Sequence, residues 1–367
     1  MRVESLYLRG FRNYEEASVA FAPGINLICG PNAQGKTNML EAVYMLTGGR
    51  SFRTRFDREM IGFEELTADI KAEIFASERH QKMEISLRRG LKKEIKLNGV
   101  KKRSGELGET LKAVLFCPDD LNLIKDGAAA RRRLMDMAIC QLRPGYAKLL
   151  ADFNKLYENK SRILRDFRDN PAMLDTLDDF SDGLARVSAK MIRYRASFAR
   201  RLSEYAAPIH REFSGRGEEL SIEYKTVSTV TDPTASAEEI YYEILEHQRS
   251  HRAAELASGS CLTGAHKDEL EISINGQSAR AFASQGQTRT AALSIKLAER
   301  EIILAETGEY PVLLLDDVLS ELDSRRQEFV LNRIGSGQTI ITCCEDDDIS
   351  RRTGGKVIFV EGGRVKE

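Results

Sequence analysis

The chain has 367 residues, of which 42% are hydrophobic and 30% are charged, and its formal net charge is −1. This length predicts two domains, or one large domain with an insertion, and a core that is stable without disulfides or structural metal. The near-neutral charge excludes attraction of the whole molecule to nucleic acid, so any contact with DNA must come from a local patch.

Cysteine spacing and hydropathy exclude further classes. The six cysteines lie outside any CxxC pair, which favours reduced thiols over a disulfide scaffold or a zinc site. The first ten residues lack the apolar core of a signal peptide, and no run of about 18 apolar residues occurs. We therefore expect a cytoplasmic protein with no membrane contact.

The first 120 residues are expected to mix strands with one helix. Short β-rich runs occur at Val3–Leu8, Ala17–Phe21 and Ile25–Cys29, and a helix is predicted over Asn38–Met45 after a glycine-rich loop. Later runs alternate apolar and polar residues, as half-buried antiparallel strands do. These runs are Ala68–Phe75, Lys82–Arg89 and Lys93–Leu97.

Residues 121–258 are expected to be mainly helical. Gly and Pro are sparse there, and charged residues recur at helical spacings of three and four. A short strand is predicted at Leu220–Lys225. No heptad is sustained over three or four repeats, which argues against a long coiled coil.

Residues 259–367 return to a mixed pattern, with a helix predicted over Thr288–Ala305 and a buried strand over Val312–Asp316. The predicted fold class is therefore α/β (α+β). Residues 1–120 and 259–367 are expected to form one discontinuous lobe, and residues 121–258 an inserted, mainly helical arm.

The segment Gly30–Thr37 fits the pattern GxxxxGK[ST] at every fixed position, between a predicted strand and a predicted helix. Glycines in such a loop let backbone amides surround phosphates at a helix N-terminus. Lys36 is expected to contact the β- and γ-phosphates of ATP, and the Thr37 hydroxyl to ligate Mg²⁺. The residues predicted to bind ATP here are Gly30, Pro31, Asn32, Ala33, Gln34, Gly35, Lys36, Thr37 and Asn38.

A second element, Val312–Asp317, has four apolar residues followed by two aspartates. This pattern predicts a buried strand that presents Asp316 at its carboxyl end, where ligands bind in open α/β sheets. Asp316 is expected to bind Mg²⁺, and Asp317 to orient or deprotonate the attacking water. Asp316, Asp317 and Lys36 are thus the predicted catalytic residues. A plain strand followed by a polar turn is the alternative.

A third element, Ser284–Gln287, precedes a predicted helix and lies before the two aspartates in the chain. A serine hydroxyl with free amides at a helix N-terminus forms an anion site. Two separated anion sites in one chain suggest that the second serves ATP held by another copy. Alone, the sequence SQGQ also fits an ordinary helix cap. Its order and spacing relative to the other two motifs favour the nucleotide site.

In this order the three motifs resemble those of the ABC-type ATPase heads of the SMC and Rad50 group. Within that group the chain is most similar to the RecF family of bacterial recombinational-repair proteins, over nearly its whole length. The segments that carry the resemblance are Leu8–Tyr14, Gly49–Thr54, Leu115–Leu121, Arg131–Asp136, Thr263–Asp268, Ser284–Arg289 and Leu313–Asp323.

The resemblance implies roles for individual residues. Arg12 and Asn13 match an N-terminal motif that lies near the nucleotide in related heads. A signature motif would close on the ATP of the partner copy, and a further loop would cross the dimer interface. The residues with these roles in trans are Ser284, Gly286, Gln287 and Asp323.

Two departures from the ABC pattern affect the chemistry. Asp317 stands where ABC enzymes have a glutamate, and its side chain is one methylene shorter, so slow hydrolysis is expected. Thr342 stands where many ABC proteins have a switch histidine, and a threonine cannot act as a histidine base.

Two basic segments are candidates for DNA contact. Arg79–Arg103 has ten basic and two acidic residues, a local charge of +8, which suits phosphate contacts, although a lysine-protected sheet edge is the alternative. Arg186–Arg201 has six basic residues and no acidic one, and an ordinary surface helix is the alternative. No base-reading motif is present, so binding is expected to be independent of sequence. The candidates are Arg88, Arg89, Lys92, Lys93, Lys101, Lys102, Arg103 and Arg193.

The resemblance implies an ATP-dependent DNA-binding protein of recombinational repair, replication-fork maintenance and the SOS response. An ATP-gated homodimer would bind single-strand gaps or junctions of single- and double-stranded DNA. It would act with RecR and RecO to assist the loading of RecA. A weak, DNA-stimulated ATPase, converting ATP to ADP and phosphate, would serve as the switch.

Three other classes of protein also fit parts of this sequence pattern. A short-armed, SMC- or Rad50-like structural tether is the main alternative. The roughly 140 residues between Phe116 and Cys261 are too few for a long arm at about 1.5 Å per helical residue. A transporter subunit and a P-loop kinase are disfavoured, because the insertion is large for the first and Ser284–Gln287 has no role in the second.

Overall fold

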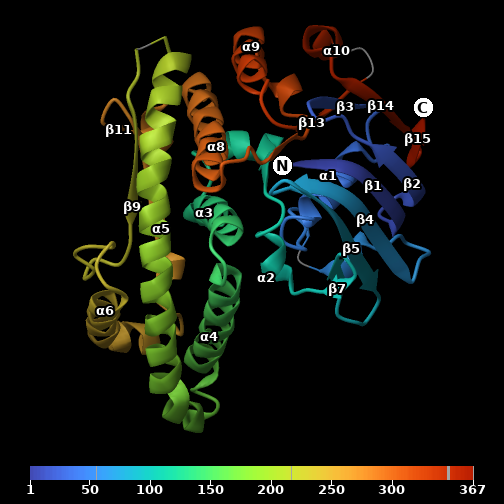
Figure 1. The fold of residues 1–367 in the computed structure, drawn as a ribbon. Helices are drawn as coiled ribbons and strands as arrows, with labels where there is room; N and C mark the ends of the chain where they lie inside the picture. Colours follow the sequence, from blue (N-terminus) through green and yellow to red (C-terminus); the bar gives the residue numbers. More distant parts are fainter. Residues whose placement is uncertain (55, 216, 345–347, 367) are drawn as a thin grey trace. The chain divides into compact units, whose positions relative to one another are not determined.

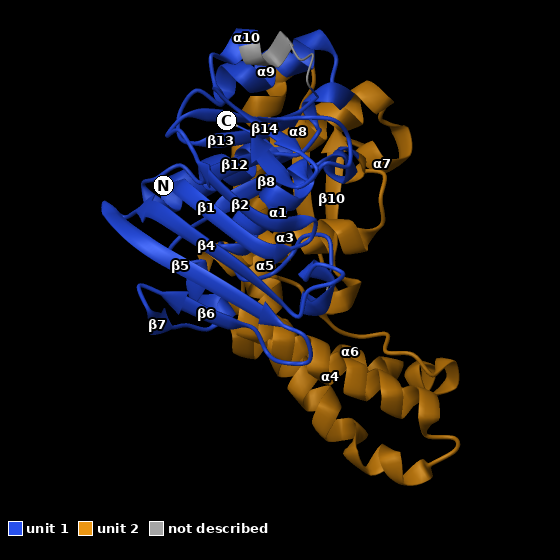
Figure 2. Ribbon diagram, turned by 90° about the vertical axis from the view of Figure 1, so that its right-hand side faces the viewer, with its two compact units in different colours: residues 1–121, 295–367 blue, residues 122–294 orange. Residues whose placement is uncertain are grey.

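The computed structural model describes residues 1–54, 56–215, 217–344 and 348–366. The chain forms two compact units, one of residues 1–121 and 295–367 and one of residues 122–294 (Figures 1 and 2). The second unit is therefore an insertion in the chain of the first. Among the described residues, no helix combines the length and the apolar character that crossing a membrane requires.

The first unit contains two six-stranded sheets, and one of them is antiparallel with the order β2-β1-β4-β5-β6-β7. In β4 and β5, buried residues alternate with more exposed ones, as in a sheet that packs one face on the core. The strands are β1 (Arg2–Phe11), β2 (Tyr14–Ala20), β4 (Thr67–Ala76), β5 (Arg79–Arg88), β6 (Glu94–Leu97) and β7 (Val100–Lys101).

The other sheet has the order β15-β14-β3-β13-β12-β8 and is parallel except for the edge strand β15. Its strands are β3 (Ile25–Cys29), β8 (Ala113–Phe116), β12 (Val312–Leu315), β13 (Thr339–Cys343), β14 (Lys356–Glu361) and β15 (Arg364–Lys366). β8, β12 and β13 are buried throughout, as parallel strands covered on both faces are. Because β3, β13 and β12 are parallel neighbours, the residues at their carboxyl ends meet at one edge of the sheet.

Helices connect these strands. α1 (Lys36–Met45) follows β3, α9 (Ser324–Arg333) comes between β12 and β13, and α8 (Gln285–Thr307) begins in the second unit and ends in the first. The shorter helical elements of the first unit are η1 (Asp57–Met60), α2 (Ser104–Leu107), η2 (Pro118–Asn122), η5 (Leu319–Glu321) and α10 (Asp348–Thr353).

The second unit is mainly helical and includes a three-stranded antiparallel sheet of order β11-β10-β9. Its longest helix, yellow-green in Figure 1, is α5, which has 37 residues and is therefore about 55 Å long. The elements are α3 (Ala128–Leu142), α4 (Tyr146–Asp166), η3 (Pro171–Thr176), α5 (Leu177–Phe213), β9 (Leu220–Lys225), α6 (Ala237–Ser258), η4 (Ala265–Lys267), β10 (Glu269–Ile274), β11 (Gln277–Ser278) and α7 (Ala279–Phe282).

A buried ionic network holds this second unit together. Arg195 of α5 binds both carboxylate oxygens of Asp136 at 2.9 Å and Oδ2 of Asp268 at 2.7 Å. Asp268 is fully buried and also accepts hydrogen bonds from Tyr224 and Thr226. Because each charge has a partner, the cost of burying the network is offset.

The mixed α/β class with a mainly helical insertion is confirmed, and the predicted strand Ile25–Cys29 coincides with β3. Residues 259–294, which the sequence-based division placed in the ATPase lobe, belong to the compact second unit. The physical reason is that β10 pairs with β9 and that Asp268 binds Arg195. The division into functional domains remains a prediction.

Candidate nucleotide-binding site

The loop between β3 and α1 depends on two glycines. Gly30 has a φ of 148°, and a Cβ atom there would lie 2.1 Å from the carbonyl oxygen of Val360. Gly35 has a φ of 117°, and its Cβ atom would lie 2.8 Å from side-chain atoms of Asn13. L side chains rarely adopt such backbone conformations, so both positions require glycine. The Tyr14 hydroxyl donates to the carbonyl oxygen of Gly35 at 2.9 Å and fixes the end of the loop.

Lys36 is the first residue of α1, and its side chain lies back over this loop. Its Nζ donates to the carbonyl oxygens of Gly30 at 2.6 Å and Pro31 at 3.1 Å, and the residue is buried. The ammonium group is therefore held at the first two residues of the loop. A positive charge and free N–H donors at a helix N-terminus together favour the phosphates of a nucleotide.

Two aspartates and two threonines meet near the carboxyl ends of β12 and β13. The Thr37 hydroxyl donates to Oδ1 of Asp316 at 2.9 Å. Oγ1 of Thr342 lies 3.1 Å from Oδ1 of Asp316 and 3.1 Å from Oδ1 of Asp317, and it accepts the N–H of Asp317 at 2.7 Å. Asp317 has a φ of 50°, an uncommon conformation for a residue other than glycine, and these contacts hold it there.

Thr37 and Asp316 supply the oxygen ligands that Mg²⁺ prefers. Protein sites for Mg²⁺ use one or two such ligands and complete the shell with water and substrate phosphates. Burial raises the pKa of Asp316, and the charge of Asp317 raises it further. The hydrogen bond from Thr37 lowers this pKa in part. A nearby cation would stabilise such a buried carboxylate, so these residues fit a magnesium ion. The described residues contain no cluster of three or more His, Cys, Asp or Glu that would hold a metal without phosphate oxygens.

Arg12 binds a buried carboxylate in α1. Its Nε and Nη2 donate to the two carboxylate oxygens of Glu41 at 2.8 and 2.7 Å, and Nη1 donates to the carbonyl oxygen of Glu59 at 2.7 Å. Glu41 is fully buried and also accepts a hydrogen bond from Ser51. The guanidinium group of Arg12 is thus engaged within the protein, and its contact with nucleotide remains a prediction.

Asn13 connects the phosphate loop to α1. Its Nδ2 donates to the carbonyl oxygen of Gln34 at 2.9 Å, and its Oδ1 accepts from Asn38 at 2.8 Å. Arg53 then donates to Oδ1 of Asn38 at 2.7 Å, and its charge lowers the pKa of Asp316. No role was predicted for Arg53 or Glu41 from the sequence. Arg53 could have been found from the sequence, because it lies in Gly49–Thr54, one of the segments that carry the family resemblance.

Ser284–Gln287 lies in the second unit, at the start of α8. The Ser284 N–H donates to Oε1 of Gln287 at 2.9 Å, and the Gln287 N–H donates to Oγ of Ser284 at 3.3 Å. These reciprocal bonds form a capping box. Asp323 caps α9 in the first unit by accepting the N–H of Arg326 at 3.0 Å. Contacts of these residues with the ATP of a second copy remain predictions.

Several candidates for DNA contact have partners within their own unit. Arg89 donates to the carbonyl oxygens of Gly62, Phe63 and Glu65, and Lys93 pairs with Asp57 at 2.9 Å. Lys101 and Lys102 pair with Glu94 at 3.1 Å and Glu106 at 3.4 Å. Within the part of the chain that the structure describes, no such pair is found for the exposed candidates Arg88, Lys92, Arg103 and Arg193. The charge of the Arg79–Arg103 segment is thus partly neutralised.

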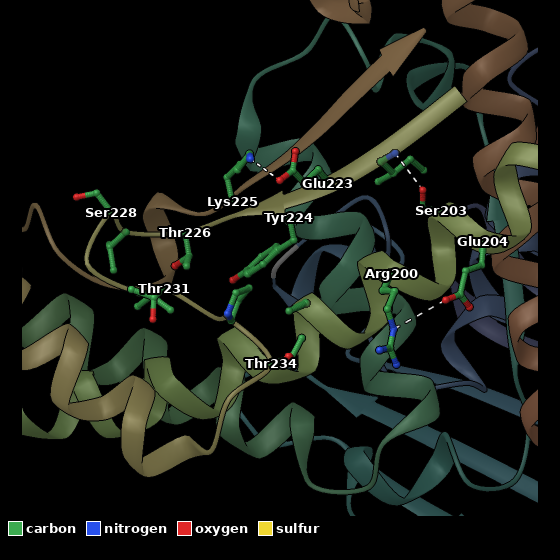
Figure 3. Close-up of a pocket in the computed structure, with 15 residues that line it drawn as sticks. Arg200, Ser203, Glu204, Glu223, Tyr224, Lys225, Thr226, Ser228, Thr231 and Thr234 are labelled. Carbon is green, nitrogen blue, oxygen red and sulfur yellow. Dashed lines mark hydrogen bonds and ion pairs between the residues drawn. The ribbon is translucent and has the colours of Figure 1, made fainter. Parts of the chain in front are cut away.

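A cavity of about 710 Å³ lies within the second unit (Figure 3). It is lined by α5, β9 and the loop after β9. Its charged side chains occur in opposite pairs, Arg200 with Glu204 and Lys225 with Glu223. This balance gives the cavity no preference for phosphate, and none of its lining residues was predicted to bind nucleotide.

A phosphate-binding loop after β3, with two aspartates after β12 of the same parallel sheet, defines the class of P-loop ATPase heads. The family model described as the RecF/RecN/SMC N terminal domain matches residues 2–361. The chain is 38% identical over 368 residues to the DNA replication and repair protein RecF of Acetivibrio thermocellus, and the match covers 100% of both chains. The chain belongs to the RecF family.

Two solved structures of the recombination mediator protein RecF in the RecFOR pathway have the same fold. The RecF-ATPrS structure has a TM-score of 0.92 at 33% identity, with 100% of this chain and 97% of that chain covered. The RecF-ATP structure has a TM-score of 0.86 at 33% identity, with 99% and 96% covered. These findings confirm the predicted family, the ATPase-head fold with its helical insertion, and the association with DNA replication and repair.

Proposed function

We propose that this chain is an ATP-driven switch that pairs two copies on DNA during recombinational repair. The observation that carries the proposal is the cluster of Thr37, Asp316, Asp317 and Thr342 beside the phosphate-binding loop. The cluster combines groups that can hold a nucleotide with a carboxylate that can direct a water molecule at the nucleotide. The similarity to RecF structures with ATP and ATPrS supports ATP as the nucleotide.

Each residue of this cluster then has a chemical role. Lys36 compensates the negative charge of the β- and γ-phosphates, and Thr37 and Asp316 hold Mg²⁺. When bound, Mg²⁺ neutralises the charge that develops on the transferred phosphoryl group. Asp317 orients the attacking water, and Thr342 orients Asp317. Because Asp317 is shorter than the glutamate of ABC enzymes, hydrolysis is slow and acts as a reset.

The second half of the site is supplied by another copy of the chain. Ser284, Gly286 and Gln287 would contact the γ-phosphate of ATP held by the partner, and Asp323 would lie at the interface. ATP then binds the closed dimer more tightly than the separate chains, and this difference in affinity drives association. Loss of the γ-phosphate on hydrolysis removes the difference and releases the dimer.

DNA is the ligand of the paired form. Because the similar RecF proteins act in the RecFOR pathway, we infer that this chain acts there too, in the cytoplasm, at gaps or junctions of single- and double-stranded DNA. Its partners would be RecR and, indirectly, RecO and RecA. A structural tether is less well supported, because α5, at about 55 Å, is short for a bridging arm.

The proposal is tested by sedimentation of wild type and Lys36→Ala, with and without ATP and Mg²⁺. Wild type is expected to change from monomer to dimer on ATP addition, and Lys36→Ala to remain a monomer. Lys155→Ala removes an exposed lysine of α4 and serves as the matched control, which dimerises like wild type. Equal ATP-dependent dimerisation of Lys36→Ala and wild type would refute the proposal.

A further inference from the structure

A line of three side chains connects the Ser284–Gln287 segment to the end of α5 within the second unit. Nε2 of Gln287 donates to Oε1 of Glu218 at 2.9 Å. Oε2 of the same carboxylate lies 3.0 Å from Nε2 of His210, a fully buried residue near the end of α5. Neither Glu218 nor His210 has a role in the proposed nucleotide chemistry.

The chemistry of these groups fixes the direction of the hydrogen bonds. A carboxylate only accepts, so His210 donates from Nε2 and carries no proton on Nδ1 while the ring is neutral. Burial lowers the pKa of His210 more than the charge of Glu218 raises it, so the ring is neutral at neutral pH. Nδ1 faces α8, where Oγ of Ser294 lies 3.5 Å away and donates to the carbonyl oxygen of Thr290, and the Thr290 backbone also interacts with the His210 ring.

Both the oxygen and the nitrogen of the Gln287 side-chain amide form hydrogen bonds. Oε1 accepts the N–H of Ser284, and Nε2 donates to Glu218. A rotation of the amide would break both bonds. The backbone N–H of Gln287 also donates to the hydroxyl of Ser284. The position of Glu218 therefore determines the rotamer of Gln287 and, through the capping box, the placement of Ser284.

We propose that Glu218, held by His210, is a positioning residue for the Ser284–Gln287 segment and makes its geometry depend on the end of α5. The inference rests on the proposed function, in which this segment closes on the ATP of the partner copy. It adds a residue outside the Ser284–Gln287 segment on which the pairing of two copies depends.

The test separates ATP binding by one chain from ATP-dependent pairing of two. Glu218→Ala is compared with Glu218→Gln, whose amide oxygen still accepts from Gln287, and with Glu219→Ala, which removes the exposed neighbouring carboxylate. Binding of a fluorescent ATP analogue is measured at chain concentrations where the protein is monomeric. Dimerisation with ATP and Mg²⁺ is measured by sedimentation.

We expect Glu218→Ala to bind the analogue as wild type does but to dimerise about tenfold more weakly, the effect of one lost hydrogen bond to a charged group. Glu218→Gln should recover most of this loss, and Glu219→Ala should match wild type. In a double-mutant cycle, Glu218→Ala and Gln287→Ala should be non-additive, because they remove the same bond.

The outcomes distinguish this inference from the proposed function. If wild type does not dimerise with ATP, the proposed function fails and the inference falls with it. If wild type dimerises and Glu218→Ala dimerises equally well, the inference alone is overturned. A fall in melting temperature and in monomer ATP binding, together with weaker pairing, would also overturn it, because Glu218 would then act only on stability.

Discussion

Thr342 contacts Asp317 through a single hydroxyl group in two ways, accepting its backbone N–H at 2.7 Å and lying 3.1 Å from its carboxylate Oδ1. The backbone and the side chain of the residue assigned to the attacking water are thus fixed by one neighbour. A threonine cannot take up a proton as a histidine does at this position in many ABC proteins. We propose that it orients Asp317 in this chain.

Replacing Thr342 by valine keeps the shape of the side chain and removes the hydroxyl. We expect the rate of phosphate release to fall about tenfold, or about 1.4 kcal/mol in the barrier, because the variant loses the hydrogen bonds by which the hydroxyl orients Asp317. ATP binding should change little, because Lys36 and Thr37 remain. Thr342→Ser keeps the hydroxyl and should retain most of the rate. An unchanged rate in Thr342→Val would remove this role from the residue.

Arg12 stabilises the fold by pairing with the fully buried Glu41. Arg12→Ala leaves that carboxylate without its main partner, and we expect a loss of about 3 kcal/mol in the free energy of unfolding. Urea denaturation measures it. Arg2→Ala removes a partly exposed pair with Glu4 and should cost less than about 1 kcal/mol. If both variants lost less than about 1 kcal/mol in the free energy of unfolding, the pair of Arg12 with Glu41 would not be important for stability.

His266 makes the stability depend on pH. Its ring packs on Tyr157 with centroids 4.5 Å apart, its Nε2 donates to the carbonyl oxygen of Cys261, and burial lowers its pKa to about 4. Among the described residues, no hydrogen-bond partner for Nδ1 is found. Below about pH 6.5 the unfolded chain binds a proton that the folded chain excludes, so stability falls as the pH drops from about 6.5 towards 4.

His266→Gln should weaken this dependence. Between pH 7 and pH 5 the variant is expected to lose about 2 kcal/mol less than wild type, because its side chain takes up no proton in the unfolded state. Urea denaturation at both pH values gives the difference. The other four histidines remain in the variant, so they serve as the internal control. Parallel losses in the two proteins would show that His266 does not titrate as its burial implies.

The basic segment near β5 should divide into residues that contact DNA and residues that hold the fold. We expect Arg88→Ala with Lys92→Ala to weaken DNA binding and to lower its dependence on salt concentration, because both side chains are exposed. Arg89→Ala should instead lower the melting temperature, since its guanidinium binds three carbonyl oxygens. Binding of gapped DNA at several salt concentrations, with melting curves, separates the two. Unaltered affinity in the double variant would exclude this surface.

The phosphate loop and the buried strand before Asp316 were predictable from sequence, because their patterns combine functional residues with the strands that carry them. Magnesium binding by Thr37 and Asp316 stays a prediction. The contacts of Arg12 with Glu41 and of Thr342 with Asp317 were not predictable. Their partners lie 29 and 25 residues apart on different elements, and only the packed fold brings them together.

The same physical reason explains the missed parts of the fold. β8 (Ala113–Phe116) is a four-residue apolar run without alternation, which no periodic pattern distinguishes from other buried segments. The pairing of β9 with β10 joins distant parts of the chain, and it places residues 259–294 in the second unit. Local propensity carries no information about such pairings.

Mixing two inactive variants tests whether the nucleotide site is shared between two copies of the chain. Lys36→Ala cannot hold ATP but keeps Ser284, and Ser284→Arg holds ATP but lacks the serine. A mixed dimer contains one site built from an intact loop and an intact Ser284 segment. If the site is shared, ATP hydrolysis, absent from each variant alone, reappears on mixing. A mixture as inactive as its components, while wild type hydrolyses ATP, would contradict a shared site.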